Sequence, residues 1–343
     1  MYYNSVNNNL IFRGVNLENV GFTTSIPVEV VFAAGLRPVD LNNIFITDKN
    51  PGNLLDKAEK VGFPRSTCAW IKGIYSAVLE KNDINTIIGV VEGDCSNARA
   101  LLEVLELNGI KCIPFSYPNS QKYEHVEAEI LKLCTRFGVT LNDCIVVKKE
   151  LDVVRKKLLY LDELTWKLNK VNGFENHIWQ VSSSDFNGDY KTFDADLDKA
   201  ICEIEKRSEG HKKVRIGYIG VPPINADLYE FIETLGAGVV YNEVQRQFTM
   251  ADGVCIEDIV EVYRKFTYPY SLNGRLKDIK NEIEKRQIDG VIHYTQAFCF
   301  RGIEDIIIRK ELNVPVLTLE GDRPGCLDQR TKLRIESFID MIV

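Results

Sequence analysis

Residues 291–338, VIHYTQAFCFRGIEDIIIRKELNVPVLTLEGDRPGCLDQRTKLRIESF, decide how we interpret the fold. A short apolar run at 291–292 leads through polar and aromatic residues to Cys299, and a helical stretch follows. A second buried-strand candidate, 314–319, then runs into the acidic residues Glu320 and Asp322. Because ligands collect at the carboxyl ends of strands in an open parallel sheet, this stretch predicts a functional edge. A lone cysteine is nevertheless more often a small buried hydrophobic residue.

The rest of the chain repeats this alternation of strands and helices. In the second half we expect strands at 214–220, 236–241 and 290–294, with helices at 227–235, at 276–286 and from about 328. In the first half we expect helices at 26–35 and 96–108 and strands at 43–47, 83–91 and 109–115, after an irregular stretch at 1–25. Residues 120–210 are mainly helical in pattern. The sequence therefore predicts an α/β protein with two doubly wound, Rossmann-like parallel-sheet domains, 1–210 with a helical connector and 211–343.

Composition limits the possible functions. The chain has 343 residues, 45% hydrophobic and 27% charged, which suits a globular protein of two domains. Its net charge of −7 argues against nucleic acid as the main partner. No apolar run approaches the roughly 20 residues that span a bilayer, and residues 1–12 lack the pattern of a secretory signal. We therefore expect a cytoplasmic protein without a membrane partner.

Nine cysteines are the unusual feature of the composition. An odd number without an export signal argues against a disulfide framework, and the absence of any CxxC excludes zinc ribbons and thioredoxin-like motifs. Two interpretations stay open, ordinary buried thiols or ligands of a soft metal or iron–sulfur cluster gathered from distant positions.

Three of the cysteines are distinguished by position. Cys95 follows a buried strand and precedes a helix, Cys299 occupies the corresponding place in the second half, and Cys68 comes just before a helix. Cys95 and Cys299 therefore face the strand-end crevices of the two halves, and a helix N-terminus, as at Cys68, stabilises a thiolate. Together the three positions predict a site in an interdomain cleft. Cys112 and Cys202 lie in apolar runs and are expected in the core, whereas Cys326 is a reserve candidate beside the acidic loop.

Several segments, in this order and spacing, resemble one family. They are IPVEVVFAAGLRPV, STCAWIKG, VVEGDCSNARALLEVLE, RIGYIG with GAGVVYNE, and DGVIHYTQAFC through VPVLTLEGD to QRTKLRIESF. The chain resembles the cluster subunits of 2-hydroxyacyl-CoA dehydratases and benzoyl-CoA reductases, including the 2-hydroxyglutaryl-CoA dehydratase D-component type and the double-cubane cluster proteins. The resemblance implies that Cys68, Cys95 and Cys299 ligate an iron–sulfur cluster, either [4Fe-4S] or a double-cubane [8Fe-9S].

The resemblance also implies an activity. A separate ATP-hydrolysing iron–sulfur activator would deliver low-potential electrons, and in the acyl-CoA branch the electron forms a ketyl radical on the thioester, which permits loss of a 2-hydroxyl group. The double-cubane branch reduces small molecules. The implied partners are the activator, an acyl-CoA or other small substrate, and a second copy or a related subunit. A cluster-free protein that binds a small ligand on the same scaffold is the alternative.

Other residues have two interpretations each. Glu29 matches an acidic position of the family's N-terminal motif and is a catalytic candidate, but a carboxylate at a helix start also has a structural role. His293, before Cys299, is a candidate proton donor or a structural histidine. Glu320 and Asp322 are either acid–base groups or solvated loop residues. Gly217 and Gly220 do not complete a dinucleotide fingerprint, since prolines follow where free helix amides are needed.

Overall fold

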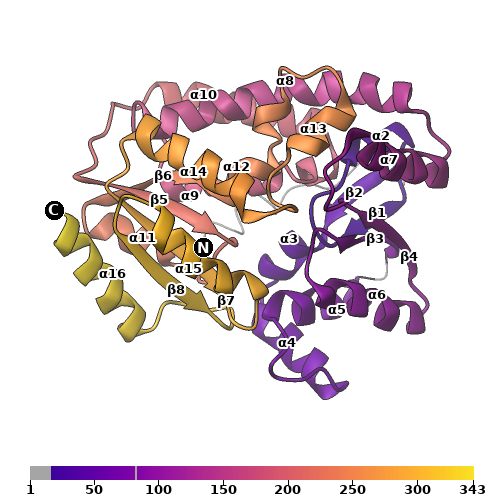
Figure 1. Ribbon diagram of the computed structural model, residues 1–343, viewed down its shortest axis with the longest axis horizontal. Helices are drawn as coiled ribbons and strands as arrows, with labels where there is room; N and C mark the ends of the chain where they lie inside the picture. Colours follow the sequence, from indigo (N-terminus) through magenta and orange to yellow (C-terminus); the bar gives the residue numbers. More distant parts are fainter. Residues whose placement is uncertain (1–16, 82) are drawn as a thin grey trace.

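Two four-stranded parallel sheets form the framework of the computed structural model, which describes residues 17–81 and 83–343. The order in the first sheet is β2-β1-β3-β4 and in the second β6-β5-β7-β8. In each sheet the chain adds a strand on one side of the first strand and later strands on the other side. The reversal point of this strand order lies between β1 and β3 in the first sheet and between β5 and β7 in the second. The α/β prediction with doubly wound parallel sheets is thereby confirmed (Figure 1). The strands are β1 (Asn19–Phe22), β2 (Arg37–Asp40), β3 (Ile84–Glu92), β4 (Lys111–Ser116), β5 (Val214–Gly220), β6 (Ala237–Asn242), β7 (Gly290–Gln296) and β8 (Val316–Gly321).

Helices cover both faces of each sheet and fill the connector. Those of the first half are α2 (Val28–Ala33), α3 (Leu41–Ile46), α4 (Pro51–Lys60), α5 (Ala69–Glu80) and α6 (Ser96–Leu107). The connector holds α7 (Tyr123–Phe137), α8 (Leu141–Trp166), α9 (Gly173–Ser182), the 3-10 turn η1 (Phe186–Gly188) and α10 (Tyr190–Glu205). The second half has α11 (Leu228–Thr234), α12 (Glu243–Phe248), η2 (Ala251–Gly253), α13 (Ile259–Lys265), α14 (Leu272–Arg286), η3 (Phe300–Glu304), α15 (Asp305–Glu311) and α16 (Gln329–Ile342).

Alternating side chains of the central strands separate the cores. On β3, Ile87 packs with Leu101 of α6, whereas Ile88 packs on the opposite face with residues of α2, α7 and α8. On β7, Ile292 packs with Phe338 of α16, and Val291 packs with the α14 side. Because successive strand residues point to opposite faces, a parallel sheet buried on both sides needs an almost continuous apolar run.

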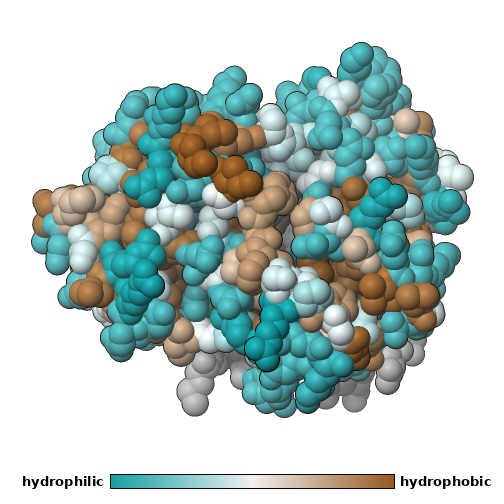
Figure 2. Space-filling model, turned by 60° about the horizontal axis from the view of Figure 1, so that its bottom comes forward, coloured by the Kyte–Doolittle hydropathy of each residue, from teal (hydrophilic) through white to brown (hydrophobic). Residues whose placement is uncertain are grey.

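The two halves share packing. Segment 250–270 of the second half contributes Ile259, Tyr263 and Phe266 to the core around the first sheet. Conversely, Phe45 and Ala69 of the first half belong to the core around the second sheet. Figure 2 shows two lobes that meet along a seam where hydrophobic side chains reach the surface. The domain bounds 1–210 and 211–343 stay a prediction.

The structure corrects three expectations. Residues 43–47 are not a strand, because the side chain of Asp40 accepts a hydrogen bond from Asn42 N and caps α3, which buries Leu41 and Phe45 four residues apart. Strand β1 lies in a stretch that we expected to be irregular. Cys202 is exposed rather than in the core, because it lies beside, not on, the apolar stripe of α10.

Two observations concern membrane and export. None of the helices in the described part of the chain is both long and apolar enough to cross a bilayer. The predicted absence of a secretory signal falls on residues 1–12, which lie outside the described residues.

Candidate functional site: a cavity lined by three thiols

A cavity of about 130 Å³ lies where the carboxyl ends of the two sheets meet. Thr23 follows β1 and Asp94 follows β3, so both come from the reversal point of the first sheet. Val221 follows β5 and Gln296 ends β7, at the reversal point of the second sheet. Ligands of doubly wound sheets bind at such points, and here two of them open into the same space.

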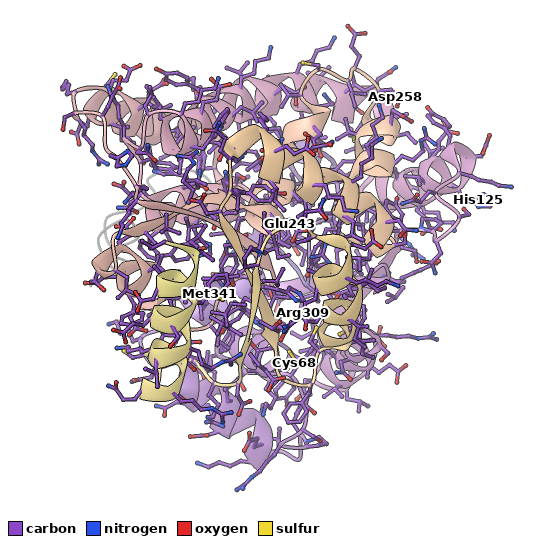
Figure 3. The ribbon with its side chains drawn as sticks, turned by 60° about the vertical axis from the view of Figure 1, so that its left-hand side comes forward. Cys68, His125, Glu243, Asp258, Arg309 and Met341 are labelled. Carbon is purple, nitrogen blue, oxygen red and sulfur yellow. The ribbon has the colours of Figure 1, made fainter. Side chains whose placement is uncertain are left out.

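Cys68, Cys95 and Cys299 all line this cavity. Each occupies the N-cap position of a helical element, before α5, α6 and η3 respectively. Cys68, labelled in Figure 3, belongs to the first half, but it lines the same cavity as Val221 and Cys299 of the second half. The structure therefore brings together the three thiols that the sequence singled out.

Burial controls the protonation of these thiols. It raises the pKa of Cys68 to about 12 and that of Cys95 to about 11, and it also raises the pKa of Cys299. Backbone amides in the first turn of the following helix oppose the shift at each thiol. The thiols also interact with one another, since thiolate charge on Cys299 raises the pKa of both other cysteines. At neutral pH the protein alone therefore keeps all three protonated.

One cation faces the thiols. Arg301 is buried in the cavity wall, where its Nη1 donates to Glu304 Oε1 at 3.1 Å and its Nη2 donates to the Tyr268 carbonyl at 2.8 Å. Its guanidinium lies 4.3 Å from the centroid of the Tyr268 ring. The positive charge favours the thiolate of Cys299 and the carboxylate of Asp94. Arg301 is thus positioned to compensate negative charge in the cavity.

Two polar atoms of lining residues have no hydrogen-bond partner among the described residues. They are Trp70 Nε1, a donor, and Gln296 Oε1, an acceptor. The Gln296 amide is fixed because its Nε2 donates to the Asp322 carbonyl at 2.8 Å. Buried polar atoms without partners are costly, so both atoms favour a ligand with polar groups in the cavity.

A second polar group on the wall centres on Asp40. Its carboxylate accepts hydrogen bonds from Ser184 Oγ at 2.6 Å and Asn42 N at 2.9 Å, and burial raises its pKa. Asp185 accepts from Asp40 N at 2.7 Å, and burial together with the charge of Asp40 raises its pKa to about 7. His177 also lines the cavity, and burial lowers its pKa to about 3, so its ring is neutral.

The structure does not bring Glu29 to the cavity wall. This carboxylate lies on α2, fully buried, and accepts from Arg155 Nη2 at 2.8 Å and from Tyr263 OH at 2.6 Å. It thereby ties α2 to α8 and α13. These contacts give Glu29 a structural role, and its catalytic role stays a prediction.

His293 is also buried behind the wall rather than in it. Its Nδ1 lies 2.8 Å from Asp305 Oδ1, which also accepts from Thr318 Oγ1 at 2.6 Å. Burial lowers the pKa of His293 despite the hydrogen bond with Asp305. A catalytic role for His293 likewise stays a prediction.

The reserve candidate Cys326 and the two acidic residues of the neighbouring loop lie elsewhere. Glu320, Asp322 and Cys326 are exposed, and none of them lines the cavity. The acidic loop contributes a backbone carbonyl that holds Gln296, not a side chain to the site.

Sequence reasoning missed several lining residues. Trp70, Asp94 and Arg301 are one or two positions from a predicted thiol, and this proximity was a usable signal. Asp40 and His177 come from β2 and α9, and nothing in their sequence context connects them with the cysteines.

The fold and the cavity define a class of protein. Thiols are ligands of soft metals and of iron–sulfur clusters, and this is a two-sheet α/β protein with one buried and two half-buried thiols on one cavity between its sheets. In the part of the chain that the structure describes, no three His, Cys, Asp or Glu side chains meet closely enough to hold a single metal ion.

A family model then identifies the class more closely. The model for 2-hydroxyglutaryl-CoA dehydratase, D-component, matches residues 23–342, and the chain belongs to this family. The family implies a dehydratase-type enzyme component that acts in 2-hydroxyacyl-CoA chemistry. A comparison with curated proteins finds no match.

Proposed function

We propose that this protein is the cluster-bearing component of a 2-hydroxyacyl-CoA dehydratase and that Cys68, Cys95 and Cys299 ligate its iron–sulfur cluster. The observation that carries the proposal is the convergence of these three thiols, from distant parts of the chain, on one cavity. Membership of the D-component family agrees with this assignment, since the family is known for binding iron–sulfur clusters.

The residues of the cavity fit such a group. As cluster ligands the three thiols would be deprotonated and carry negative charge, and Arg301 supplies a buried positive charge beside Cys299. A cluster has several irons, so its ligands need not converge on one point as they do around a single ion. The raised pKa values do not oppose ligation, because metal binding displaces the thiol protons. Trp70 Nε1 is a donor available to a cluster sulfide or to a bound substrate.

The cluster, when bound, would supply one-electron chemistry at low potential. The protein would hold it away from water in the cleft, and Arg301 would offset its charge. Asp40 is the carboxyl group on the wall that is not adjacent in sequence to a thiol, so it is the residue we assign to hold or release a proton. We infer an ATP-dependent iron–sulfur activator as the electron donor and a 2-hydroxyacyl-CoA as the substrate, from the family alone.

Anaerobic purification with quantification of iron and sulfide tests the proposal. Wild-type protein should be brown and contain both elements after reconstitution, whereas Cys95→Ala should lose most of them. Cys202→Ala is the matched control, because this thiol is exposed on α10 and does not line the cavity. A colourless wild type, or equal iron content in the two variants, would overturn the assignment. Turnover of 2-hydroxyacyl-CoA with activator and ATP then tests the reaction.

A further inference from the structure

A chain of buried polar side chains leads from the connector to the cavity. Its members are, in order, Asp162 of α8, Asn176 of α9, Asn242 at the end of β6, Tyr229 of α11, Gln245 of α12 and His177 of α9. We call these six residues the polar chain. All of them are buried, and the last one lines the cavity. Buried polar groups need hydrogen-bond partners, so the order of donors and acceptors along the polar chain is constrained.

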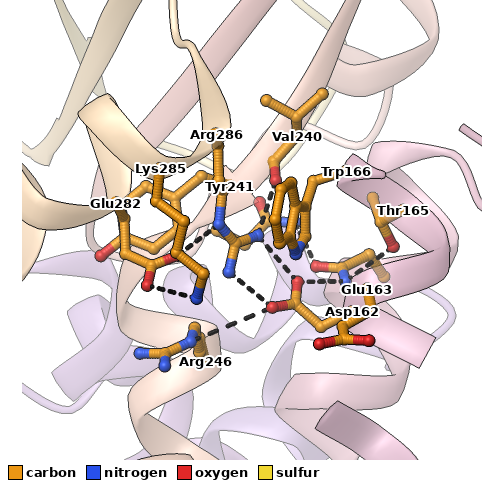
Figure 4. A network of polar contacts seen from close by, with 12 residues as sticks. Asp162, Glu163, Thr165, Trp166, Val240, Tyr241, Arg246, Glu282, Lys285 and Arg286 are labelled. Carbon is orange, nitrogen blue, oxygen red and sulfur yellow. Dashed lines mark hydrogen bonds and ion pairs between the residues drawn. The ribbon is translucent and has the colours of Figure 1, made fainter. Parts of the chain in front are cut away.

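The first half of the polar chain has a single direction. Asp162 is ionised and held by Arg286 (Figure 4), so its oxygens can only accept. Asn176 Nδ2 donates to Asp162 Oδ1 at 3.1 Å and to Thr165 Oγ1 at 3.0 Å, which leaves the Oδ1 of Asn176 as an acceptor. Asn242 Nδ2 donates to this oxygen at 2.8 Å, and the Oδ1 of Asn242 is therefore an acceptor in turn.

The second half continues in the same direction and ends at the imidazole. Tyr229 OH donates to Asn242 Oδ1 at 2.7 Å, so the Tyr229 oxygen is left to accept. Gln245 Nε2 donates to this oxygen at 3.3 Å. Turning the amide over would place Gln245 Oε1 against a hydroxyl oxygen whose proton is already donated to Asn242. The other proton of Gln245 Nε2 is shared with His177 Nδ1, 3.1 Å away, so this ring nitrogen accepts.

The polar chain therefore selects the tautomer of His177. Burial lowers the pKa of this residue to about 3, so the ring is neutral and carries one N–H. Because Nδ1 accepts from Gln245, the proton is on Nε2. Neighbouring rings, with centroids 5.2 Å away for Tyr229 and 6.1 Å away for Phe174, hold the imidazole in place. Within the described part of the chain Nε2 has no hydrogen-bond partner, and the ring lines the cavity, so its N–H is available to a ligand.

The cavity offers groups that complement a 2-hydroxyacyl thioester. A neutral N–H such as that of His177 suits a carbonyl oxygen, which can only accept. Gln296 Oε1 is an acceptor without a partner among the described residues, and a hydroxyl group can donate to it. A 2-hydroxyacyl thioester has a carbonyl and a hydroxyl group on adjacent carbons. Trp70 Nε1 is a second donor, but an indole donates in every environment, whereas His177 donates from Nε2 only because the polar chain imposes it.

We propose that His177 is a ligand-binding residue that donates from Nε2 to the thioester carbonyl oxygen of the substrate, and that Gln245 is the residue that positions its proton. The identity of the ligand rests on the proposed function, whereas the tautomer follows from the hydrogen bonds of the polar chain. Preorganised donors stabilise negative charge on the oxygen that they bind, so the same contact would polarise the thioester.

NMR of the full-length protein with ¹⁵N-labelled histidine tests the tautomer at pH 8. Long-range ¹H–¹⁵N correlations distinguish protonated from unprotonated ring nitrogens, and the signals of His177 are those that disappear in His177→Phe. The wild type should show a protonated Nε2 and an unprotonated Nδ1. Gln245→Glu should protonate Nδ1, because a carboxylate can only accept from the ring. A wild-type ring protonated on Nδ1, or the same spectrum in wild type and Gln245→Glu, would overturn the proposal.

Binding of lactyl-CoA, the 2-hydroxyacyl thioester with a methyl side chain, tests the donor. Titration calorimetry should give a dissociation constant about tenfold higher for His177→Phe than for the wild type, the effect of one lost hydrogen bond. With a ¹³C-labelled carbonyl, the infrared carbonyl stretch should lie at lower frequency in the saturated wild type than in free lactyl-CoA, and His177→Phe should lose most of this shift. His211→Phe, at an exposed histidine outside the cavity, is the matched control and should behave as the wild type in both measurements.

Three results would overturn the assignment of the donor: no binding by the wild type, an equal carbonyl shift in wild type and His177→Phe, or a shift that only Trp70→Phe removes. Circular dichroism shows whether each variant is folded, and His177→Gln, which keeps an amide N–H, should retain part of the shift. Iron content is the separate readout for the proposed function. Protein without iron that shows the His177-dependent shift would refute the cluster and leave the donor standing, whereas iron-containing protein without the shift would refute the donor and leave the cluster standing.

Discussion

Replacement of Asp162 by asparagine should destabilise the contact between the connector and the second sheet. Asp162 on α8 accepts from Arg286 Nη1 at 3.0 Å and Nη2 at 2.6 Å, and both side chains are almost fully buried (Figure 4). Burial alone would raise the pKa of Asp162, but the charge and hydrogen bonds of Arg286 outweigh it and lower the pKa. The pair is therefore ionised at neutral pH.

The expected loss is about 3 kcal/mol of unfolding free energy. Removing one partner of a buried ion pair costs about 3–5 kcal/mol, because the other charge is left uncompensated. Arg286 keeps Glu282 and the Val240 carbonyl as partners, and asparagine preserves the shape of the aspartate. These remaining contacts place the expectation at the lower end of the range.

Urea unfolding at pH 7 measures this difference, with Glu163→Gln as the control. Glu163 is adjacent on α8 but forms an exposed pair with Lys167 at 2.9 Å, and such pairs contribute about 0–1 kcal/mol. Because the pKa of folded Asp162 lies below its unfolded value, the pair stabilises above the ordinary aspartate range and is lost as pH falls through the folded pKa. The difference between wild type and Asp162→Asn should therefore shrink in acid. Equal losses in the two variants would refute this reasoning.

Three further predictions concern the second sheet and the cavity. Gly220→Ala should lower the unfolding free energy by more than about 2 kcal/mol, since φ is +93° and the new Cβ would lie 2.2 Å from the Tyr294 carbonyl oxygen. Gly62→Ala, with φ of +113° and open space around it, should lower it less, and equal urea midpoints would contradict the steric argument. Glu243→Gln should lower the unfolding free energy by about 3 kcal/mol, because Arg275 is fully buried and donates two hydrogen bonds to Glu243, at 2.7 and 2.9 Å. A change below about 1 kcal/mol in urea unfolding would show that Glu304, the other partner of Arg275, compensates its charge alone. Burial lowers the pKa of His177 from 6.5 to about 3, so between these pH values the unfolded chain binds a proton that the folded chain does not. The unfolding free energy should therefore fall as pH drops from 6.5 towards 3. His177→Gln should weaken this dependence, and an unchanged pH profile would argue against the neutral ring.

Much of the fold follows from local pattern. The apolar run of β3 and the helical spacing of α6 are visible in the sequence because a strand buried on both faces and a helix with one buried stripe each need a particular order of residues. Position relative to these elements was also enough to select Cys68, Cys95 and Cys299 from nine cysteines. Residues 43–47 were predicted wrongly because the capping hydrogen bond that Asn42 N donates to the Asp40 side chain, together with burial of Leu41 and Phe45, outweighs the strand propensity of a short run.

The tertiary structure alone decided which side chains share the cavity. Asp40 and His177 reach it only because β2 pairs with β1 and α9 packs against β6, and no local sequence pattern encodes that proximity. Glu29 is the opposite case, a residue that the sequence predicted for the site but that the fold places elsewhere. Its position in a motif predicted a catalytic role, whereas its contacts with Arg155 and Tyr263 come from elements far along the chain. Sequence by itself determined most of the strands and helices and the candidate thiols, because each depends on neighbours in the chain. Burial, pairing and exposure depend on contacts between distant segments, and these only the folded chain determines.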